Sequence, residues 1–342
     1  LLGAGENGGG ESHSEGAFIL TPDYRNVFWA PSAMLKMSDQ VVFEMGNVAG
    51  AVKPEGGFFT ALDSGDKMGF HLGNSNAETI AYRANSVTGL LLPENTWEIF
   101  YAMKDLRWGL SFWSSMSKKE STRQSQDDFG LRTDGSFGSN WGWSLVLGLA
   151  SRAKNEVAYE VPVGGASPPV LRGEYKAGVS SRFSVTYKWD LDSRIMVSAQ
   201  NSSFRFADFE NVISDKANRF YGLKYGRSIK LAGGVLGFTA GIQQTTSDDR
   251  VAKTKIISNN LPVSILLENE VASWLILRGG VRQSILIASS STITPTTTTT
   301  DFSGADTVVS AGAGLKFNNV VVDGVLGAAS GGVLDGVNTF TQ

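Results

Sequence analysis

The chain has 342 residues, no cysteine and a formal net charge of −3 at neutral pH. The lack of cysteine excludes disulfides and thiolate metal sites, and the small negative charge gives no electrostatic reason to expect nucleic acid as a partner. No window approaches 18 consecutive apolar residues, so the sequence predicts no transmembrane helix. This composition does not exclude membrane-spanning strands, because apolar and polar residues alternate along such strands and form no long apolar run. No cofactor is predicted.

The first 24 residues predict a flexible tether. They contain GAGENGGGESHSEG, which consists mainly of glycine, serine and acidic residues. No basic region followed by an apolar region opens the chain, so an exported protein would already have lost its signal peptide. Cysteine-free composition suits export through an oxidising periplasm.

Residues 25–39 form a short apolar segment in which Pro31 suits the first turn of a short helix. Two interpretations are open. The segment is a short core or interfacial helix, or it is a periplasmic hatch that partly fills a barrel. The hatch would use Phe28, Trp29, Pro31, Met34 and Leu35.

From residue 40 to the end, the chain predicts a meander of strands. The candidates are 40–47, 56–63, 67–75, 96–104, 107–117, 127–133, 141–152, 172–189, 194–206, 218–228, 235–246, 260–271, 274–287, 306–317 and 320–328. No amphipathic helix pattern separates neighbouring strands, which disfavours crossovers and a parallel sheet.

The stretch 141–152, WGWSLVLGLASR, shows the alternation most clearly. Bulky apolar residues (Trp141, Trp143 and the leucines) alternate with small or polar ones that end at Arg152. An apolar face opposite a face of glycine, serine and arginine is typical of a wall between lipid and water. The stretch 172–189 keeps one parity for eighteen residues, with Lys176 on the polar face. The sequence therefore predicts an all-β, transmembrane, antiparallel up-and-down β-barrel.

Short and long connections between the predicted strands alternate along the chain. Short turns near 64–66, 105–106, 134–140, 190–193, 229–234, 271–273 and 318–319 alternate with polar loops near 48–55, 76–95, 118–126, 153–171, 207–217, 247–259 and 288–305. Tight periplasmic turns and long extracellular loops are expected of an outer-membrane barrel.

Five of the eight tryptophans fall within a few residues of a predicted short turn, namely Trp108, Trp141, Trp143, Trp189 and Trp274. This placement predicts an aromatic girdle at one membrane interface. Ordinary strand aromatics are the alternative interpretation.

On these patterns, residues 40–342 resemble a bacterial outer-membrane β-barrel. A narrower resemblance is to FadL/PorV-like barrels, which place an Asn-Pro-Ala segment before the first strand. Here Trp29–Ala33 occupies that place, with Ala30 instead of asparagine and Ser32 inserted. The stretches Leu261–Val263 and Trp274–Val281 are similar to a late hairpin of such proteins.

The number of strands is constrained by pairing. Fifteen candidates leave an odd number, whereas single-chain bacterial barrels have an even one. We therefore expect 338–342 to begin a sixteenth strand whose last residues are missing from the chain. A count of 14 follows if the first two strands belong to the hatch.

The residues that alternation predicts to face inward include charged groups of both signs. The predicted lumen-lining residues are Glu98, Lys104, Arg107, Arg132, Arg152, Arg182, Lys188, Lys224, Arg278, Arg282 and Lys316. A mild preference for anions is one hypothesis, and a solvated, ion-paired interior is the other. His71 faces inward and no G-x-S-x-G motif occurs, so neither an enzyme nor a metal site is predicted.

The sequence thus predicts a bacterial outer-membrane barrel that passes or binds small molecules, as a porin-like channel or a FadL-like transporter of hydrophobic solutes. The rival is a plugged structural barrel that anchors an envelope protein complex, and a large soluble β-protein is a third interpretation. Expected partners are outer-membrane lipid or lipopolysaccharide, with a homo-oligomer or envelope proteins as further candidates.

Overall fold

A computed structural model describes residues 24–48, 51–74, 83, 90–93, 95–156, 173–207, 211–293, 297–301, 305–317, 320–329 and 334–341. Apart from residue 24, the predicted tether lies outside the described residues, as do most of the predicted loops at 76–95 and 153–171 and parts of the loop at 288–305. No helix among the described residues is long and apolar enough to cross a membrane.

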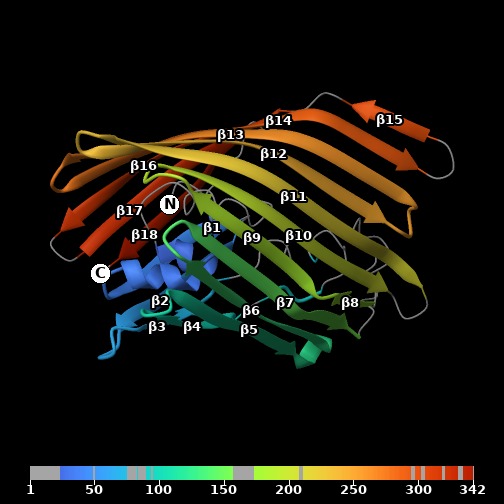
Figure 1. Ribbon diagram of the computed structural model, residues 1–342. Helices are drawn as coiled ribbons and strands as arrows, with labels where there is room; N and C mark the ends of the chain where they lie inside the picture. Colours follow the sequence, from blue (N-terminus) through green and yellow to red (C-terminus); the bar gives the residue numbers. More distant parts are fainter. Residues whose placement is uncertain are drawn as a thin grey trace.

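Nearly all described residues belong to one antiparallel sheet (Figure 1). Its strands are β1 (Gln40–Val48), β2 (Ala51–Ala61), β3 (Lys67–Leu72), β4 (Trp97–Met103), β5 (Trp108–Lys119), β6 (Gln124–Phe137), β7 (Trp141–Asn155), β8 (Gly173–Ala177), β9 (Ser180–Lys188), β10 (Ser193–Ala207), β11 (Val212–Leu231), β12 (Gly234–Asp249), β13 (Thr254–Ala272), β14 (Leu275–Ile293), β15 (Thr297–Asp301), β16 (Ala305–Phe317), β17 (Val320–Ala329) and β18 (Leu334–Thr341). The helical elements are η1 (Tyr24–Phe28), η2 (Pro31–Lys36) and η3 (Glu120–Thr122).

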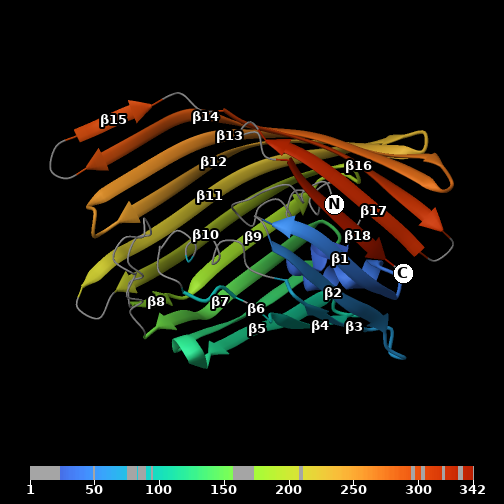
Figure 2. The ribbon, with the colours of Figure 1, turned by 180° about the vertical axis from the view of Figure 1, so that it is seen from behind.

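The eighteen segments make sixteen strands of wall. Segments β8 and β9 both pair with β7 and β10, and β15 and β16 both pair with β14, so each of these pairs is one interrupted strand. Strand β18 pairs with β17 and with β1, so the hydrogen-bonded neighbours form a closed ring (Figure 2). The prediction of sixteen antiparallel strands is confirmed. The alternative of fourteen is wrong, because β1 and β2 pair within the wall.

One end of the ring, here called the turn end, carries the short connections 62–66, 104–107, 138–140 and 273–274; the opposite end is the loop end. Several long loops predicted at the loop end are wrong. Val48 pairs with Ala51, and the predicted loops at 207–217 and 247–259 largely extend β11, β12 and β13. These stretches lack the sustained alternation of apolar and polar residues, so their sequence resembles that of loops.

The two faces of the wall differ as the alternation predicts. Ser144 and Ser184 face inward on β7 and β9 and are hydrogen-bonded at 2.7 Å. Outward residues on the same and neighbouring strands are large, apolar and exposed. They include Leu149, Val179, Phe183, Val197, Leu223, Ile242 and Ile265. Among the described residues no second sheet covers this apolar outer face, so the soluble interpretation has no support.

The segment before β1 lies inside the ring at the turn end, where Figure 1 shows it in blue. Its side chains Val27, Phe28 and Met34 are buried against Phe59 and Phe100 of β2 and β4. One hydrophobic core is therefore the contact between the N-terminal segment and the inner face of β1, β2 and β4. A second cluster gathers Leu90, Ala153, Tyr175, Phe204 and Phe206.

Candidate functional site

The predicted hatch segment, residues 25–39, is held against the wall by a polar contact. The backbone N–H of Ser32 donates to Asp134 Oδ1 of β6 at 2.8 Å, and the Ser32 hydroxyl donates to Asp134 Oδ2. Gly109 of β5 permits this approach, because a Cβ there would lie 2.2 Å from the Ser32 nitrogen. The first turn of η2 therefore rests directly on the backbone of the wall.

Charged groups fix both ends of the hatch segment. Arg25 forms an ion pair with the buried carboxylate of Glu44 on β1 and lies 3.8 Å from Glu55 of β2. At the other end, Lys67 Nζ of β3 donates to the Met37 carbonyl and to Asp39 Oδ1, both at 2.8 Å. Opposite charges on the segment and on the wall thus pair at both ends.

The five predicted hatch residues have different surroundings. Phe28, Pro31 and Met34 are buried, and Phe28 also contacts His71 edge-on, with ring centroids 4.8 Å apart. Leu35 is partly buried against the same cluster. Trp29 faces the opposite wall, where the guanidinium of Arg182 on β9 lies 5.4 Å from its ring centroid.

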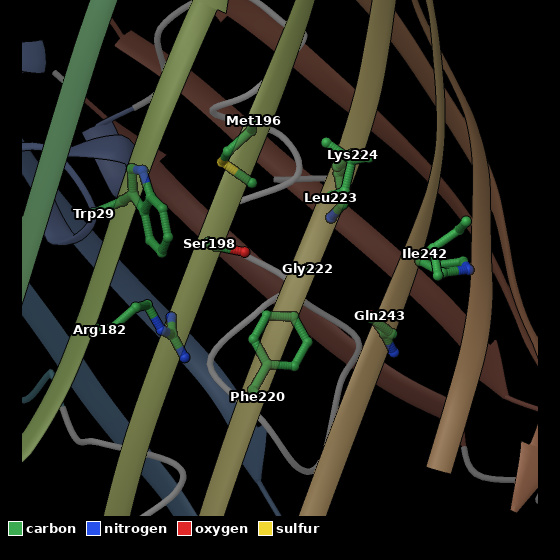
Figure 3. A pocket seen from close by; sticks show the side chains of 11 residues that line it. Trp29, Arg182, Met196, Ser198, Phe220, Gly222, Leu223, Lys224, Ile242 and Gln243 are labelled. Atoms are coloured by element: carbon green, nitrogen blue, oxygen red, sulfur yellow. The ribbon is translucent and has the colours of Figure 1, made fainter.

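Trp29 borders a pocket between the hatch segment and the wall at β9–β13, with an empty volume of about 420 Å³ (Figure 3). The apolar lining comes from Trp29, Met196 and Phe220, and the basic groups from Arg182 and Lys224. Of the predicted hatch residues, only Trp29 lines this pocket; the others fill the contact with the wall.

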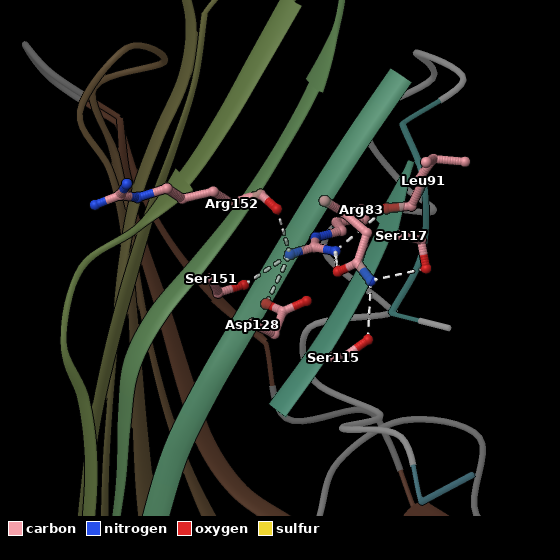
Figure 4. A network of polar contacts seen from close by, with 8 residues as sticks. Arg83, Leu91, Ser115, Ser117, Asp128, Ser151 and Arg152 are labelled. Carbon is pink, nitrogen blue, oxygen red and sulfur yellow. Dashed lines mark hydrogen bonds and ion pairs between the residues drawn. The ribbon is translucent and has the colours of Figure 1, made fainter. Parts of the chain in front are cut away.

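Arg83, which belongs to the connection between β3 and β4, lies inside the ring. Arg83 Nη2 donates to Asp128 Oδ1 of β6 at 2.7 Å and to the Ser151 hydroxyl of β7 at 2.9 Å, with its side chain fully buried (Figure 4). The guanidinium lies 5.1 Å from the ring centroid of Tyr175 on β8. Sequence reasoning missed Arg83, because a single arginine in a predicted loop carries no pattern.

The predicted lumen residues Glu98 and Arg132 meet across β4, β5 and β6. They form an ion pair, and the Ser111 hydroxyl donates to Glu98 Oε1 at 2.6 Å. The Arg132 guanidinium lies 4.2 Å from the ring centroid of Trp113. Arg132, Trp113 and Asp128 line a pocket with an empty volume of about 680 Å³.

The inner face of β9–β14 is basic. Arg182 and Lys188 of β9 and Lys224 of β11 face inward there, as predicted by parity, together with Arg194, Arg278 and Arg282. Lys188 interacts electrostatically with two further cations, Lys36 of η2 and Arg194.

Acidic groups on this side lie close to basic ones. Arg278 Nε donates to Glu268 Oε2 at 2.8 Å, and the same guanidinium forms an ion pair with Asp323 of β17. Lys316, near the turn end of β16, lies 2.6 Å from Glu270. The basic side chains named above for the inner face of β9–β14 still outnumber these acidic ones.

Three predicted lumen residues are corrected by the structure. Lys104 and Arg107 lie in the exposed turn between β4 and β5, outside the strands. Arg152 faces outward, because the register between β6 and β7 shifts by one residue at Leu149. After this bulge Ser151 takes the inward position opposite Asp128, and Arg152 lies opposite Asp127 on the outer face.

A matching shift occurs one strand further. Between β8 and β9 the chain gains one residue relative to β10, so Tyr175 is buried inside while Phe183 is exposed outside. The prediction of a single parity over 172–189 is therefore wrong, and Lys176 faces outward. Sequence alternation missed both shifts because small residues at Ala150 and Gly178 suit either face.

The five tryptophans of the predicted girdle all lie at the turn end. Trp108 and Trp141 begin β5 and β7, Trp143 is two residues further, and Trp189 and Trp274 lie in or next to turns. The Trp141 and Tyr187 rings are 4.7 Å apart, and Trp189 stacks on Tyr225 at 5.5 Å. The structure thus gathers these residues into one band around the wall.

No protein-family model and no curated protein sequence matches this chain. Solved structures do. A bacterial polysaccharide outer membrane secretin aligns with a TM-score of 0.51 at 10% identity, covering 89% of this chain and 96% of that one. The toluene transporter TbuX of Ralstonia pickettii gives 0.43 at 12% identity, covering 94% of each chain. A porin gives 0.43 at 9% identity, covering 89% and 98%.

The closed antiparallel ring, its apolar outer face and the similarity to the secretin together define the class of fold. The chain has the fold of a bacterial outer-membrane β-barrel, as the sequence predicted. Because the identity is low, these likenesses bear on the fold alone.

Proposed function

We propose that this protein is a channel of the bacterial outer membrane that passes small solutes, with a preference for anions. The observation that carries the proposal is the asymmetry of the inner wall. Acids of β1–β6 such as Glu44, Glu98 and Asp128 are engaged by arginines, and the hatch segment and Arg83 cover part of that side. The inner face of β9–β14 is basic, with Arg182, Lys188 and Lys224 along it.

A positive surface beside water concentrates anions and repels cations. The solute path would run between the hatch segment and the β9–β14 wall, where Trp29 and Arg182 form its narrow part at the turn end. The acids on this side lie beside Arg278 and Lys316, so they offset little of the remaining positive charge.

Reversal potentials across a planar bilayer with a salt gradient test this function. The wild-type protein should show stable conductance steps with a potential of the sign that anion passage requires. The variant with Arg182→Gln, Lys188→Gln and Lys224→Gln should lose most of that preference. The matched control replaces the exposed outward cations Arg219, Arg227 and Lys255 with glutamine, removes the same charge and should stay anion-selective.

Cation selectivity of the wild-type channel would contradict the proposal. Silence from protein shown to be inserted would contradict it too, and would favour the plugged barrel that anchors an envelope complex. In that case the hatch segment and Arg83 would serve to close the lumen permanently.

The pocket beside Trp29 favours a second candidate, a transporter of solutes with an apolar body. Met196, Phe220 and Trp29 offer apolar contact there, beside Arg182 and Lys224. Mass spectrometry of organic extracts from purified protein tests this candidate. A bound apolar solute that Trp29→Ala and Phe220→Ala both release would support it, and retention by both variants would count against it.

A further inference from the structure

Three basic side chains form a row on the outer face near the loop end. Arg152 of β7 lies opposite Lys176 of β8, which lies opposite Arg205 of β10. All three are exposed. Neighbouring strands are about 4.8 Å apart, so three positive charges fall within roughly 10 Å of one another.

The depth of the row in the membrane follows from the aromatic band at the turn end. Trp141 and Arg152 are eleven positions apart on β7, and Tyr187 and Lys176 are eleven apart on β8 and β9. A tilted strand needs about 9–11 residues to cross the hydrocarbon core. Exposed apolar residues such as Val179, Phe183 and Val197 fill the interval. The row therefore lies one hydrocarbon thickness from the aromatic band, at the level of lipid headgroups.

Acids mark the limits of the row. Asp127 of β6 lies opposite Arg152, and Asp215 of β11 lies opposite Arg205, where it also accepts from Arg250 at 3.3 Å. Along β8, Glu174 lies 2.9 Å from Lys176. Within the part of the chain that the structure describes, the guanidinium groups of Arg152 and Arg205 form no ion pair or hydrogen bond.

The chemistry of these groups identifies the ligand class. Arginine presents a planar fork of donors that matches phosphate oxygens, and cations at a membrane surface attract anionic headgroups. We propose that Arg152, Lys176 and Arg205 bind the phosphate groups of lipid A, the phosphorylated glycolipid of lipopolysaccharide in the outer leaflet. The proposal assumes the outer-membrane location with the loop end outside, but it does not depend on solute passage.

Native mass spectrometry of the full chain in detergent measures this binding directly. Diphosphorylated lipid A, dephosphorylated lipid A and phosphatidylglycerol are titrated in parallel. The row variant carries Arg152→Gln, Lys176→Gln and Arg205→Gln, and the control carries glutamine at Arg219, Arg227 and Lys255. Heat-modifiable migration on gels establishes that each variant is folded.

The wild type and the control should bind diphosphorylated lipid A with similar Kd. The row variant should bind it on the order of a hundredfold more weakly, from about fivefold for each cation. Should the row variant not fold, Arg152→Lys with Arg205→Lys keeps the charge, removes both forks, and should still weaken binding severalfold.

Three results would overturn the proposal. Equal affinity of the row variant and the control would show that the row has no special part in binding. Equal affinity for dephosphorylated lipid A would show that sugar or acyl chains are recognised instead of phosphate. Equal affinity for phosphatidylglycerol would assign the row to anionic lipids in general.

Discussion

Asp134 of β6 accepts two hydrogen bonds from Ser32, one from its backbone N–H and one from its hydroxyl. A buried carboxylate of the wall thereby fixes the first turn of η2 inside the ring. The contact connects two elements about a hundred residues apart in the chain, and it is one of the polar contacts that hold the hatch segment on the wall.

Asp134→Ala should loosen the hatch segment. Hydrogen bonds to a charged group contribute about 1.5–3 kcal/mol, so the segment should leave the wall more often. Single-channel recording should show larger or more frequent conductance steps than in the wild type. Asp105→Ala, in the exposed turn between β4 and β5, is the control and should leave the trace unchanged. Identical traces from both variants would mean that this contact does not hold the segment.

Gly109→Ala should have a related effect for a steric reason. A Cβ at this position would lie 2.2 Å from the Ser32 nitrogen and 2.6 Å from the Pro31 carbonyl carbon, both backbone atoms. Overpacking of this kind costs about 1–3 kcal/mol, and displacement of η2 relieves it. Limited proteolysis should cut the variant near η2 faster than the wild type. Gly142→Ala, whose Cβ would meet only a carbonyl oxygen 3.8 Å away, should be cut at the wild-type rate.

Arg83→Met should lower the free energy of unfolding, measured by urea titration in lipid vesicles, by about 3–5 kcal/mol. The substitution leaves the Asp128 carboxylate buried without its cation. The double variant Arg83→Met with Asp128→Leu should recover part of the loss, because both charges are then absent. Lys118→Met removes an exposed pair with Glu120 and should cost at most about 1 kcal/mol. A loss in Arg83→Met no larger than in Lys118→Met would contradict this account.

Acid should weaken the contact between Asp39 and β3. The hydrogen bond from Lys67, with others from Ala61 and Thr60, holds the pKa of Asp39 below its usual value of 3.8. A lowered pKa in the folded state adds stability above the unfolded pKa, and this stability is lost as the pH falls through the folded pKa. The wild type should therefore melt at a higher temperature than Asp39→Asn at neutral pH, and the gap should close below about pH 4. A gap that persists in stronger acid would exclude ionisation as its cause.

The alternation of side chains allowed most of the wall to be predicted. Strand β7 was expected at 141–152 and runs over Trp141–Asn155, because period two is a direct consequence of strand geometry between two solvents. The extensions of β11–β14 beyond the membrane were missed, since residues wetted on both faces lose that alternation. Apolar residues and Pro31 indicated a short helix within residues 25–39, and η2 begins at Pro31.

Less of the candidate site than of the wall could be predicted from the sequence. Parity placed Arg182, Lys188 and Lys224 inward, where the structure has them. It failed for Arg152, because a bulge changes the face of every later residue in the strand without a change in composition. The role of Arg83 depends on contacts with strands 43 to 69 positions away, which no local pattern encodes.

The bulge at Leu149 also determines how closely the two environments of the protein meet. The carbonyl oxygen of Arg152 accepts a hydrogen bond from Arg83 inside the ring, while its guanidinium extends to the other side (Figure 4). The wall is a single layer of sheet, so the backbone and the side chain of one residue can serve its two opposite faces. Without the bulge, strict alternation along 141–152 would place Ser151 against lipid and Arg152 in the lumen. The extra residue at Leu149 therefore determines which side chains at the end of β7 face the lumen and which face lipid.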